Sequence, residues 1–303
     1  MATPAAEVHV DDTLVRSLLA AQHPDLADLT LGPRVEGWDN ITYRLGDTLA
    51  VRLPRREMGA RIATTELDWL PRIGSQWTFP APVPQRIGQP TDAYPWRWSV
   101  VPWIQGDMAY DAPLNVDGAR DLGHALAQVH TTAPSDAPLN PVRSRTLRER
   151  AETFDHRLRL IEADHPMRTA TLREAFRAAL EAASAPSTWT HLDLHGENVL
   201  TRHGRLAGIL DWGDAAVGSP ATDLGQASVL VGREHVMPML DAYAGTADRS
   251  VATFIASAAG RLAIRAEALN YAVTLAAMED QRYRNPGLRA LQGLSQRSSR
   301  TLS

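Results

Sequence analysis

The sequence has 303 residues and a net charge of −4, which argues against a nucleic-acid-binding protein because such proteins usually carry a basic excess. It contains neither cysteine nor lysine, so thiol nucleophiles, zinc–thiolate sites, P-loops and lysine Schiff bases are all excluded. No apolar run approaches the ~20 residues of a membrane-spanning helix, and the first residues do not resemble a secretory signal, so we expect a cytoplasmic protein without a membrane or nucleic-acid partner.

The first third of the chain predicts one helix followed mostly by strands. Leucines at helical spacing predict a helix at about 11–22. The pattern then changes to that of strands over 31–53, where Gly46 and Asp47 form a strong hairpin-turn signal. The elements expected next are a helix over 59–73, closed by Pro71 and Gly74, and strands near 83–87 and 97–103.

Beyond Ile104 the sequence becomes mostly helical. Helical periodicity extends over 116–131, 145–163, 168–183, 219–231, 235–243 and 251–278, and short strands are expected only at 189–192 and 206–211. Strands that precede the helices, rather than alternate with them, indicate the α+β class. We therefore expect an N-terminal sheet lobe over 1–104 and a helical lobe over 105–303.

The densest group of polar residues lies at 191–200, HLDLHGENVL, and a second group that contains Asp-Trp-Gly follows it. Phosphoryl transfer requires a carboxylate that orients the attacking hydroxyl, and oxygen ligands that hold magnesium against the phosphates. Protein kinases supply these groups from a loop in which His, Asp and Asn recur at fixed spacing, and from a later Asp-Phe-Gly. His191, Asp193 and Asn198 have that spacing, and Asp211 begins the Asp-Trp-Gly.

These motifs resemble the aminoglycoside and macrolide phosphotransferase family, which shares the protein-kinase fold. Residues 191–225 follow the family patterns HGDLHxxNxL and IDWxxAxxGxPxxDLA nearly throughout. Blocks at 36–56, 65–73 and 94–107 are also similar, so the resemblance covers about residues 30–230. It implies a bilobal kinase-like fold, with an N-terminal antiparallel sheet lobe containing one main helix and a larger, mostly helical C-terminal lobe.

The resemblance also implies roles for individual residues. Asp193 corresponds to the catalytic aspartate, and His191 supports its loop. Asn198 and Asp211 correspond to the ligands of Mg²⁺, with ATP or GTP as the phosphate donor. The implied nucleotide-binding residues form three groups. Gly37, Asp39 and Asn40 form a turn over the phosphates. Arg52 and Glu66 are the pair that binds the phosphates, and Val101 and Trp103 belong to the hinge. The residues implied to support the loop are His195, Gly213 and Asp223.

Arg52 departs from most of the kinase superfamily, which has lysine at this strand position. Arginine keeps the positive charge and can bind phosphate oxygens bidentately, but it is bulkier than lysine. Some macrolide and related phosphotransferases resemble this chain in having arginine there, so we interpret Arg52 as a working substitute.

The acceptor is expected to contact the helix predicted over 251–278. Helical spacing divides this segment into two faces. One face is apolar and is formed by Leu262, Ala266, Leu269, Val273 and Ala276. The opposite face lines the acceptor pocket or faces solvent, and it is formed by Glu267, Asn270, Tyr271, Thr274 and Met278. Acidic residues on that face would suit a cationic aminoglycoside, and its apolar ones would suit a macrolide.

The leading hypothesis is an antibiotic O-phosphotransferase that acts on an aminoglycoside, a macrolide or a related hydroxylated compound. Choline-like amines, fructosamine-like sugars and homoserine are further acceptors on this fold. A non-catalytic nucleotide-binding module is a hypothesis of another class, against which the complete set of Asp193, Asn198 and Asp211 argues. His191, Asp193 and His195 alternate along the chain and also fit a zinc hydrolase, but that alternative leaves Asn198 and Asp211 unexplained.

Overall fold

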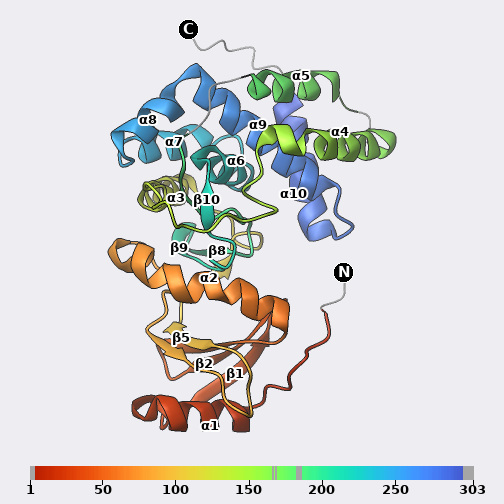
Figure 1. Cartoon of the computed structure of the whole chain (residues 1–303). Coiled ribbons are helices and arrows are strands. Elements are labelled where there is room, and N and C mark those ends of the chain that lie inside the picture. Colours follow the sequence, from red (N-terminus) through yellow and green to blue (C-terminus); the bar gives the residue numbers. More distant parts are fainter. Residues whose placement is uncertain (1–3, 166, 168, 182–185, 296–303) are drawn as a thin grey trace. The chain divides into compact units, whose positions relative to one another are not determined.

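The computed structural model describes residues 4–165, 167, 169–181 and 186–295 (Figure 1). The chain divides into two compact units. The first unit comprises Met1–Gly106 and Ala207–Asp214, and the second comprises Asp107–Leu206 and Ala215–Ser303. Strand β9 (Arg205–Ile209) carries the chain from the second unit back to the first.

An antiparallel sheet of five strands, in the order β1-β2-β3-β5-β4, forms the centre of the first unit. The expected hairpin between β2 and β3 is confirmed, and Gly46 in its turn has the positive φ of 57° that favours glycine. The elements of this unit are α1 (Asp12–Gln22), η1 (Pro24–Leu26), β1 (Leu31–Glu36), β2 (Asn40–Leu45), β3 (Leu49–Pro54), α2 (Glu57–Ile73), η2 (Gly74–Gln76), β4 (Arg86–Gly88) and β5 (Trp98–Pro102).

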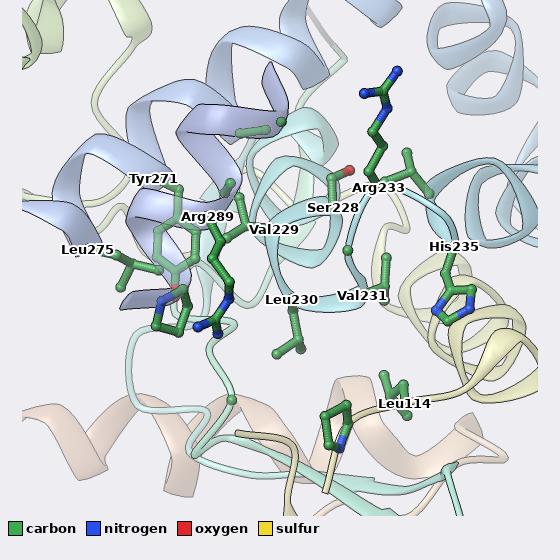
Figure 2. A pocket seen from close by; sticks show the side chains of 18 of the residues that line it. Leu114, Ser228, Val229, Leu230, Val231, Arg233, His235, Tyr271, Leu275 and Arg289 are labelled. Atoms are coloured by element: carbon green, nitrogen blue, oxygen red, sulfur yellow. The ribbon is translucent and has the colours of Figure 1, made fainter. Parts of the chain in front are cut away.

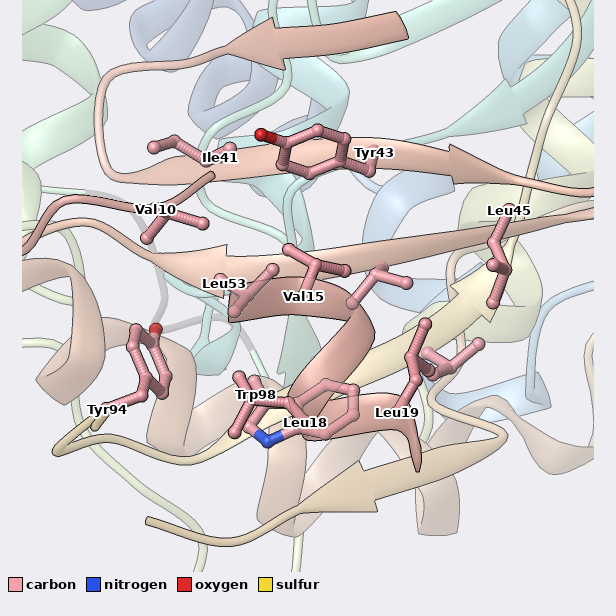
Figure 3. Close-up of a cluster of buried hydrophobic side chains, with 12 residues drawn as sticks. Val10, Val15, Leu18, Leu19, Ile41, Tyr43, Leu45, Leu53, Tyr94 and Trp98 are labelled. Atoms are coloured by element: carbon pink, nitrogen blue, oxygen red, sulfur yellow. The ribbon is translucent and has the colours of Figure 1, made fainter. Parts of the chain in front are cut away.

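Successive side chains of β3 point to opposite faces of this sheet, and the two faces have different contacts. Val51 and Leu53 are fully buried in the apolar cluster that α1 covers. Arg52, between them, points to the other face and reaches Glu66 of α2. Figure 3 shows the cluster, in which Val15, Leu18 and Leu19 of α1 pack against Ile41, Tyr43 and Leu45 of β2. Strand periodicity therefore places one cationic side chain on the α2 face of the sheet.

Helix α2 ends at Ile73 as predicted, but it begins at Glu57, two residues before the predicted start, and Pro71 does not close it. Pro71 was expected to close it, but Pro71 lies inside the helix, which continues to Ile73. A proline removes one N–H donor from a helix, and that loss is small in a last turn that Gly74 caps by donating its N–H to the Leu70 carbonyl.

The second unit is mostly helical and contains two small sheets, β10-β7 and β6-β8-β9. With the strand-rich first unit it confirms the predicted α+β class. None of the described helices is long and apolar enough to cross a membrane. The elements are β6 (Asp107–Met108), α3 (Val116–Val129), α4 (Leu147–Asp164), α5 (Thr169–Leu180), β7 (Thr188–Thr190), β8 (Val199–Arg202), β10 (Ala216–Gly218), α6 (Pro220–Val231), α7 (Val236–Ala244), α8 (Arg249–Ala256), α9 (Ala258–Ala276) and α10 (Gln281–Ser295).

Two features of the C-terminal helices differ from the prediction. The single helix expected over 251–278 is two helices, because Ser257 has an extended backbone and its hydroxyl accepts the Gly260 N–H at 3.0 Å to begin α9. Helix α10 was not predicted at all, since Pro286 and Gly287 lie within it. Positions 168, 182 and 183 of the helix expected over 168–183 lie outside the described residues.

Helix α9 is the centre of the second unit. Its buried side chains share one apolar cluster with α4, α5 and α10, in which Phe154 and Phe176 stack with their ring centroids 4.0 Å apart. Helix α6 approaches α9 closely at Gly225, where a Cβ atom would lie 2.6 Å from the Ala268 nitrogen. This packing fixes α6, and α6 in turn supports the polar loop at 191–198.

Candidate active site

The loop 191–198 connects β7 to β8, and two side chains of α6 hold its backbone. Asp223 accepts the N–H of His191 at 2.6 Å on one carboxylate oxygen and the N–H of Leu192 at 2.8 Å on the other. Gln226 accepts the Leu194 N–H and donates to the Leu192 carbonyl. Leu192 has a positive φ of 67°, a conformation that a branched residue adopts only where its surroundings enforce it. The α6 side chains therefore impose the shape of this loop.

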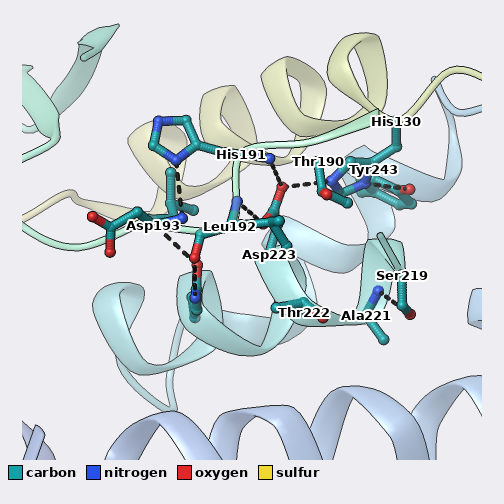
Figure 4. Close-up of polar contacts among 12 residues, drawn as sticks. His130, Thr190, His191, Leu192, Asp193, Ser219, Ala221, Thr222, Asp223 and Tyr243 are labelled. Atoms are coloured by element: carbon teal, nitrogen blue, oxygen red, sulfur yellow. Dashed lines mark hydrogen bonds and ion pairs between the residues drawn. The ribbon is translucent and has the colours of Figure 1, made fainter. Parts of the chain in front are cut away.

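Asp223 also ends a buried chain of polar contacts, shown in Figure 4. Its Oδ2 lies 3.0 Å from His130 Nε2, and His130 Nδ1 lies 2.8 Å from the Tyr243 hydroxyl. His130, Asp223 and Tyr243 are all fully buried. Burial alone would raise the pKa of Asp223, but the hydrogen bond and interaction with His130, together with His191, lower it below its usual value. The carboxylate therefore stays ionised beneath the loop.

The Asp193 carboxylate points away from Asp223 (Figure 4) and is partly accessible, with 19% of the side chain exposed. The N–H of Asp193 donates to Nδ1 of His191, whose side chain is fully buried. The guanidinium of Arg143 lies 2.6 Å from the Asp193 carboxylate. Asp193 is thus held at its backbone by His191 and at its carboxylate by Arg143.

Asn198 is oriented by contacts within the same loop. Its Nδ2 donates to the Asp193 carbonyl at 2.9 Å and lies 3.1 Å from His195 Nε2. Nδ1 of His195 accepts the N–H of Glu197. Because the amide nitrogen is engaged within the loop, the amide oxygen is the atom of Asn198 that is suited to bind a cation.

The zinc alternative is not supported by this geometry. Nδ1 of His191 and both ring nitrogens of His195 are engaged in the loop contacts. Within the described ranges, no group of three or more His, Cys, Asp or Glu side chains is arranged to hold a metal ion. The alternation of His191, Asp193 and His195 therefore serves the loop itself.

In the first unit, Arg52, Glu66 and the Asp-Trp-Gly segment form a second polar group. Arg52 Nη1 lies 3.0 Å from Glu66 Oε1, which also accepts the Trp212 N–H at 2.9 Å. Burial alone would lower the pKa of Arg52, but the negative charges of Glu66 and Asp211 raise it above its usual value. Glu66 therefore fixes both the cationic side chain of β3 and the backbone beside Asp211.

Asp211 has an unusual backbone and an exposed side chain. Its φ is 57°, in the left-handed region where residues other than glycine cluster at functional sites. Trp212 anchors the segment, with its ring 4.4 Å from that of Trp77 and its indole N–H donating to the Ile209 carbonyl. A Cβ atom on Gly213 would lie 2.3 Å from Ile62 of α2, so only glycine fits there. The Asp211 carboxylate is presented on a fixed backbone.

Asp211 and Asn198 each carry an oxygen atom of the hard kind that magnesium prefers. Asp211 belongs to the first unit, and Asn198 belongs to the second. The donor set fits Mg²⁺ in kind, because each residue offers an oxygen and neither offers sulfur or imidazole.

The predicted phosphate turn is the tip of the β1–β2 hairpin. The Gly37 N–H donates to the Asn40 carbonyl at 2.8 Å, and Arg55 donates to the Gly37 carbonyl at 3.2 Å. The Asp39 carboxylate pairs with Arg56 at 2.6 Å. This ion pair neutralises the one acidic side chain of the tip.

The predicted hinge lies at the end of β5. Val101 is buried opposite Ala50 of β3. The Trp103 N–H donates to the Thr48 carbonyl at 2.8 Å, so this amide is engaged within the sheet.

A cavity of about 1040 Å³ lies within the second unit, beside the loop 191–198. His195 and Gly196 form part of its wall, and helices α6, α9 and α10 contribute most of the rest. Figure 2 shows the cavity, with Tyr271 and Arg289 on one side and Leu230 facing them.

Of the five acceptor residues predicted on α9, only Tyr271 lines this cavity. Glu267 is buried and paired with Arg150 of α4 at 2.5 Å, and Thr274 accepts from Arg157 of the same helix. The backbone carbonyl of Asn270, one turn before Thr274, accepts a hydrogen bond from the Thr274 hydroxyl. Met278 lies beyond the end of α9. Two of the five predicted residues, Glu267 and Thr274, therefore contact α4 instead of the cavity. Leu262, assigned to the apolar face, is 37% exposed.

Sequence reasoning missed Gln226, Arg143 and His130. Gln226 lies three residues after Asp223, and this spacing places both side chains on one face of α6. Arg143 and His130 carry no such signal, because they reach the loop from distant positions in the chain.

A sequence model described as the phosphotransferase enzyme family matches residues 30–254. No curated protein sequence matches the chain significantly.

Solved structures share the fold. The GDP complex of wild-type aminoglycoside 2'-phosphotransferase-IIIa is 18% identical with a TM-score of 0.58, over 94% of this chain and 99% of that one. Macrolide 2'-phosphotransferase MphH from Brachybacterium faecium is 23% identical with a TM-score of 0.58, over 92% and 97%. The streptomycin–ATP–APH(2")-IIa ternary complex is 18% identical with a TM-score of 0.55, over 90% and 92%. At these identities the similarity establishes the fold alone, and it confirms the predicted kinase-like architecture.

Proposed function

The chain belongs to the phosphotransferase enzyme family, and we propose that it transfers the γ-phosphate of ATP or GTP to a hydroxyl group of a small molecule. The observation that carries this proposal is the loop 191–198. Asp223 and Gln226 fix its backbone, while the Asp193 carboxylate points away from them and is partly exposed. A fixed carboxylate with an accessible oxygen is what orientation of an attacking hydroxyl requires.

Asp193 is the proposed catalytic residue. Its carboxylate accepts a hydrogen bond from the acceptor hydroxyl and takes the proton as the oxygen attacks phosphorus. His191 acts as a positioning residue through the Asp193 backbone. Arg143 holds the carboxylate in one orientation before the acceptor arrives.

Arg52 and Glu66 are the proposed phosphate-gripping pair. Glu66 aligns the Arg52 guanidinium, which can then bind the α- and β-phosphate oxygens in place of the usual lysine. Asn198 and Asp211 are the residues that would hold Mg²⁺, which would supply positive charge to offset that of the phosphates. The β1–β2 tip around Gly37, Asp39 and Asn40 is the proposed cover of the phosphates.

The proposed acceptor site is the cavity that begins at His195 and Gly196. Its position beside the catalytic loop suits a hydroxylated compound that presents one hydroxyl to Asp193. An antibiotic of the aminoglycoside or macrolide kind is the leading candidate, and choline-like, fructosamine-like and homoserine-like metabolites are the alternatives.

A coupled assay of ADP and GDP release tests this proposal on a panel of aminoglycosides, macrolides and small metabolic alcohols. We expect at least one acceptor to stimulate release above the rate with water. Asp193→Asn should lower kcat for that acceptor by ~10²–10⁴-fold, because it removes the proton acceptor, and should leave the nucleotide Kd nearly unchanged. A variant that kept most of its turnover would contradict the assignment of Asp193. Nucleotide binding without turnover on the whole panel would favour a non-catalytic module.

A further inference from the structure

The cavity in the second unit has apolar walls. Val229 and Leu230 of α6 lie on one side, and Ile264, Ala268 and Leu275 of α9 lie on another. A volume of about 1040 Å³ is at the upper end of the range for small-molecule sites. The walls therefore favour a large acceptor whose body is mainly apolar.

The charged side chains of the cavity are mostly positive. Among its described lining residues, five are arginines and two are acidic, namely Arg233, Arg261, Arg265, Arg282 and Arg289 with Asp111 and Glu234. Arg282 pairs with the carboxylate of Glu197. Arg261 and Arg265 donate instead to the backbone carbonyls of Ala256 and Leu294, respectively. A neutral carbonyl does not compensate the positive charge of a guanidinium.

Arg289 is the arginine best placed to meet a ligand. Figure 2 shows its side chain extending into the cavity alongside Tyr271, whereas Arg233 points away. Within the described part of the chain, no carboxylate lies within ion-pair distance of Arg289. Its exposed position on α10 leaves the guanidinium free to bind an anionic group.

Tyr271 adds a second donor at the same place. Its buried hydroxyl lies beside the hydroxyl of Tyr110, which also lines the cavity, and the two hydroxyls interact with each other. Burial raises the pKa of Tyr271 well above its usual value, so the phenol keeps its proton and is available as a donor.

We propose that the acceptor carries an anionic group, of which a carboxylate is the simplest, on a mainly apolar body, and that Arg289 and Tyr271 bind this group. The inference rests on the proposed function, since it names the acceptor class of the same site. A planar guanidinium and a phenol O–H match the two oxygens of a carboxylate. A polycation would meet the excess of arginine charges without enough carboxylates to offset them, so this proposal disfavours aminoglycosides among the candidate acceptors.

The test uses one apolar scaffold in three charge states: cholate, its neutral amide and the amine that replaces its carboxylate, with kanamycin as the polycation. Binding is measured by thermal shift and by titration calorimetry, and turnover by nucleotide release. The variants are Arg289→Ala, Arg289→Lys and Tyr271→Phe. Arg249→Ala is the matched control, because Arg249 is an exposed helix residue outside the cavity.

Wild-type protein should bind cholate at least ~10-fold more tightly than the amide or the amine. Arg289→Ala should abolish that preference, Arg289→Lys should keep part of it, and Arg249→Ala should not change it. Equal or tighter binding of the amine or kanamycin, or a preference for cholate that survives Arg289→Ala, would overturn the inference. Asp193-dependent turnover of a cationic acceptor would overturn this inference alone, whereas Arg289-dependent binding of cholate without turnover of any acceptor would contradict the proposed function alone.

Discussion

Asp223 accepts two consecutive backbone N–H groups and contacts His130, all without exposure to water. Its carboxylate therefore performs several structural tasks for the loop that carries Asp193. Because its folded pKa is lowered, the stabilisation it provides is fully present above the unfolded value of about 4 and is lost as the pH falls through the folded value.

Asp223→Asn should lower the free energy of unfolding at pH 7 by about 3 kcal/mol, because an amide cannot accept both N–H groups and leaves buried partners unsatisfied. The wild type should lose stability as the pH falls below about 4, in part because Asp223 becomes protonated. The variant has no carboxylate at this position, so its free energy of unfolding should fall less over the same pH range. Urea unfolding followed by tryptophan fluorescence at pH 7 and pH 4 measures both effects. Tyr243→Phe is the control and should lower stability by only about 1 kcal/mol. Equal stability of Asp223→Asn and the wild type would refute this role.

Arg52 is the second residue whose role can be isolated. Arg52→Ala should raise the nucleotide KM and lower kcat/KM by more than ~10-fold, because a charge-assisted contact to the phosphates is removed. Arg52→Lys should recover part of this loss if the charge matters more than the bidentate geometry. Steady-state kinetics with varied nucleotide provide the measurement, and an unchanged KM in Arg52→Ala would exclude Arg52 from the nucleotide site.

At the scale of elements, α6 and α9 determine where the catalytic loop lies. Gly225 of α6 sits against the backbone of Ala268, where a Cβ atom would come within 2.6 Å of the nitrogen. Asp223 and Gln226 flank this contact on the same helix. A change in the spacing of the two helices would therefore move the side chains that hold the loop.

Gly225→Ala should lower the free energy of unfolding by about 1–3 kcal/mol through overpacking, and should reduce kcat because Asp223 and Gln226 shift with α6. Gly293→Ala in α10 is the matched control. Among the described residues, no atom lies within 4 Å of its added Cβ, so this substitution should be neutral or slightly stabilising. Thermal unfolding and nucleotide-release assays of both variants decide the matter, and identical behaviour of the two would contradict the close packing.

Helices with strong periodicity were predicted well from the sequence. Element boundaries that depend on a single residue were predicted poorly. The helices near 116–131 and 219–231 were found within a few residues. The break at Ser257 was missed because one capping hydroxyl interrupts an otherwise continuous pattern. Asp193, Asn198 and Asp211 were nominated by their spacing together with the family resemblance, whereas Arg143 reaches the loop only through tertiary structure.

At the scale of the whole molecule, the proposed chemistry depends on both units. The first unit includes residues 207–214 from beyond the catalytic loop, so the chain passes from the second unit into the first and back again. Asp193 and Asn198 belong to one unit, and Asp211 belongs to the other. The proposed metal ligands are therefore divided between the two units, and the proposed catalytic residue belongs to the second.

A crystal structure of the protein with magnesium and a non-hydrolysable ATP or GTP analogue tests most directly whether Asp193, Asn198 and Asp211 serve one nucleotide. We expect a metal ion ~2.1 Å from the Asn198 amide oxygen and from an Asp211 carboxylate oxygen, with the γ-phosphate beside Asp193. An Asp193 carboxylate more than about 10 Å from both Asn198 and Asp211, too far to serve the same metal–phosphate cluster, would contradict it.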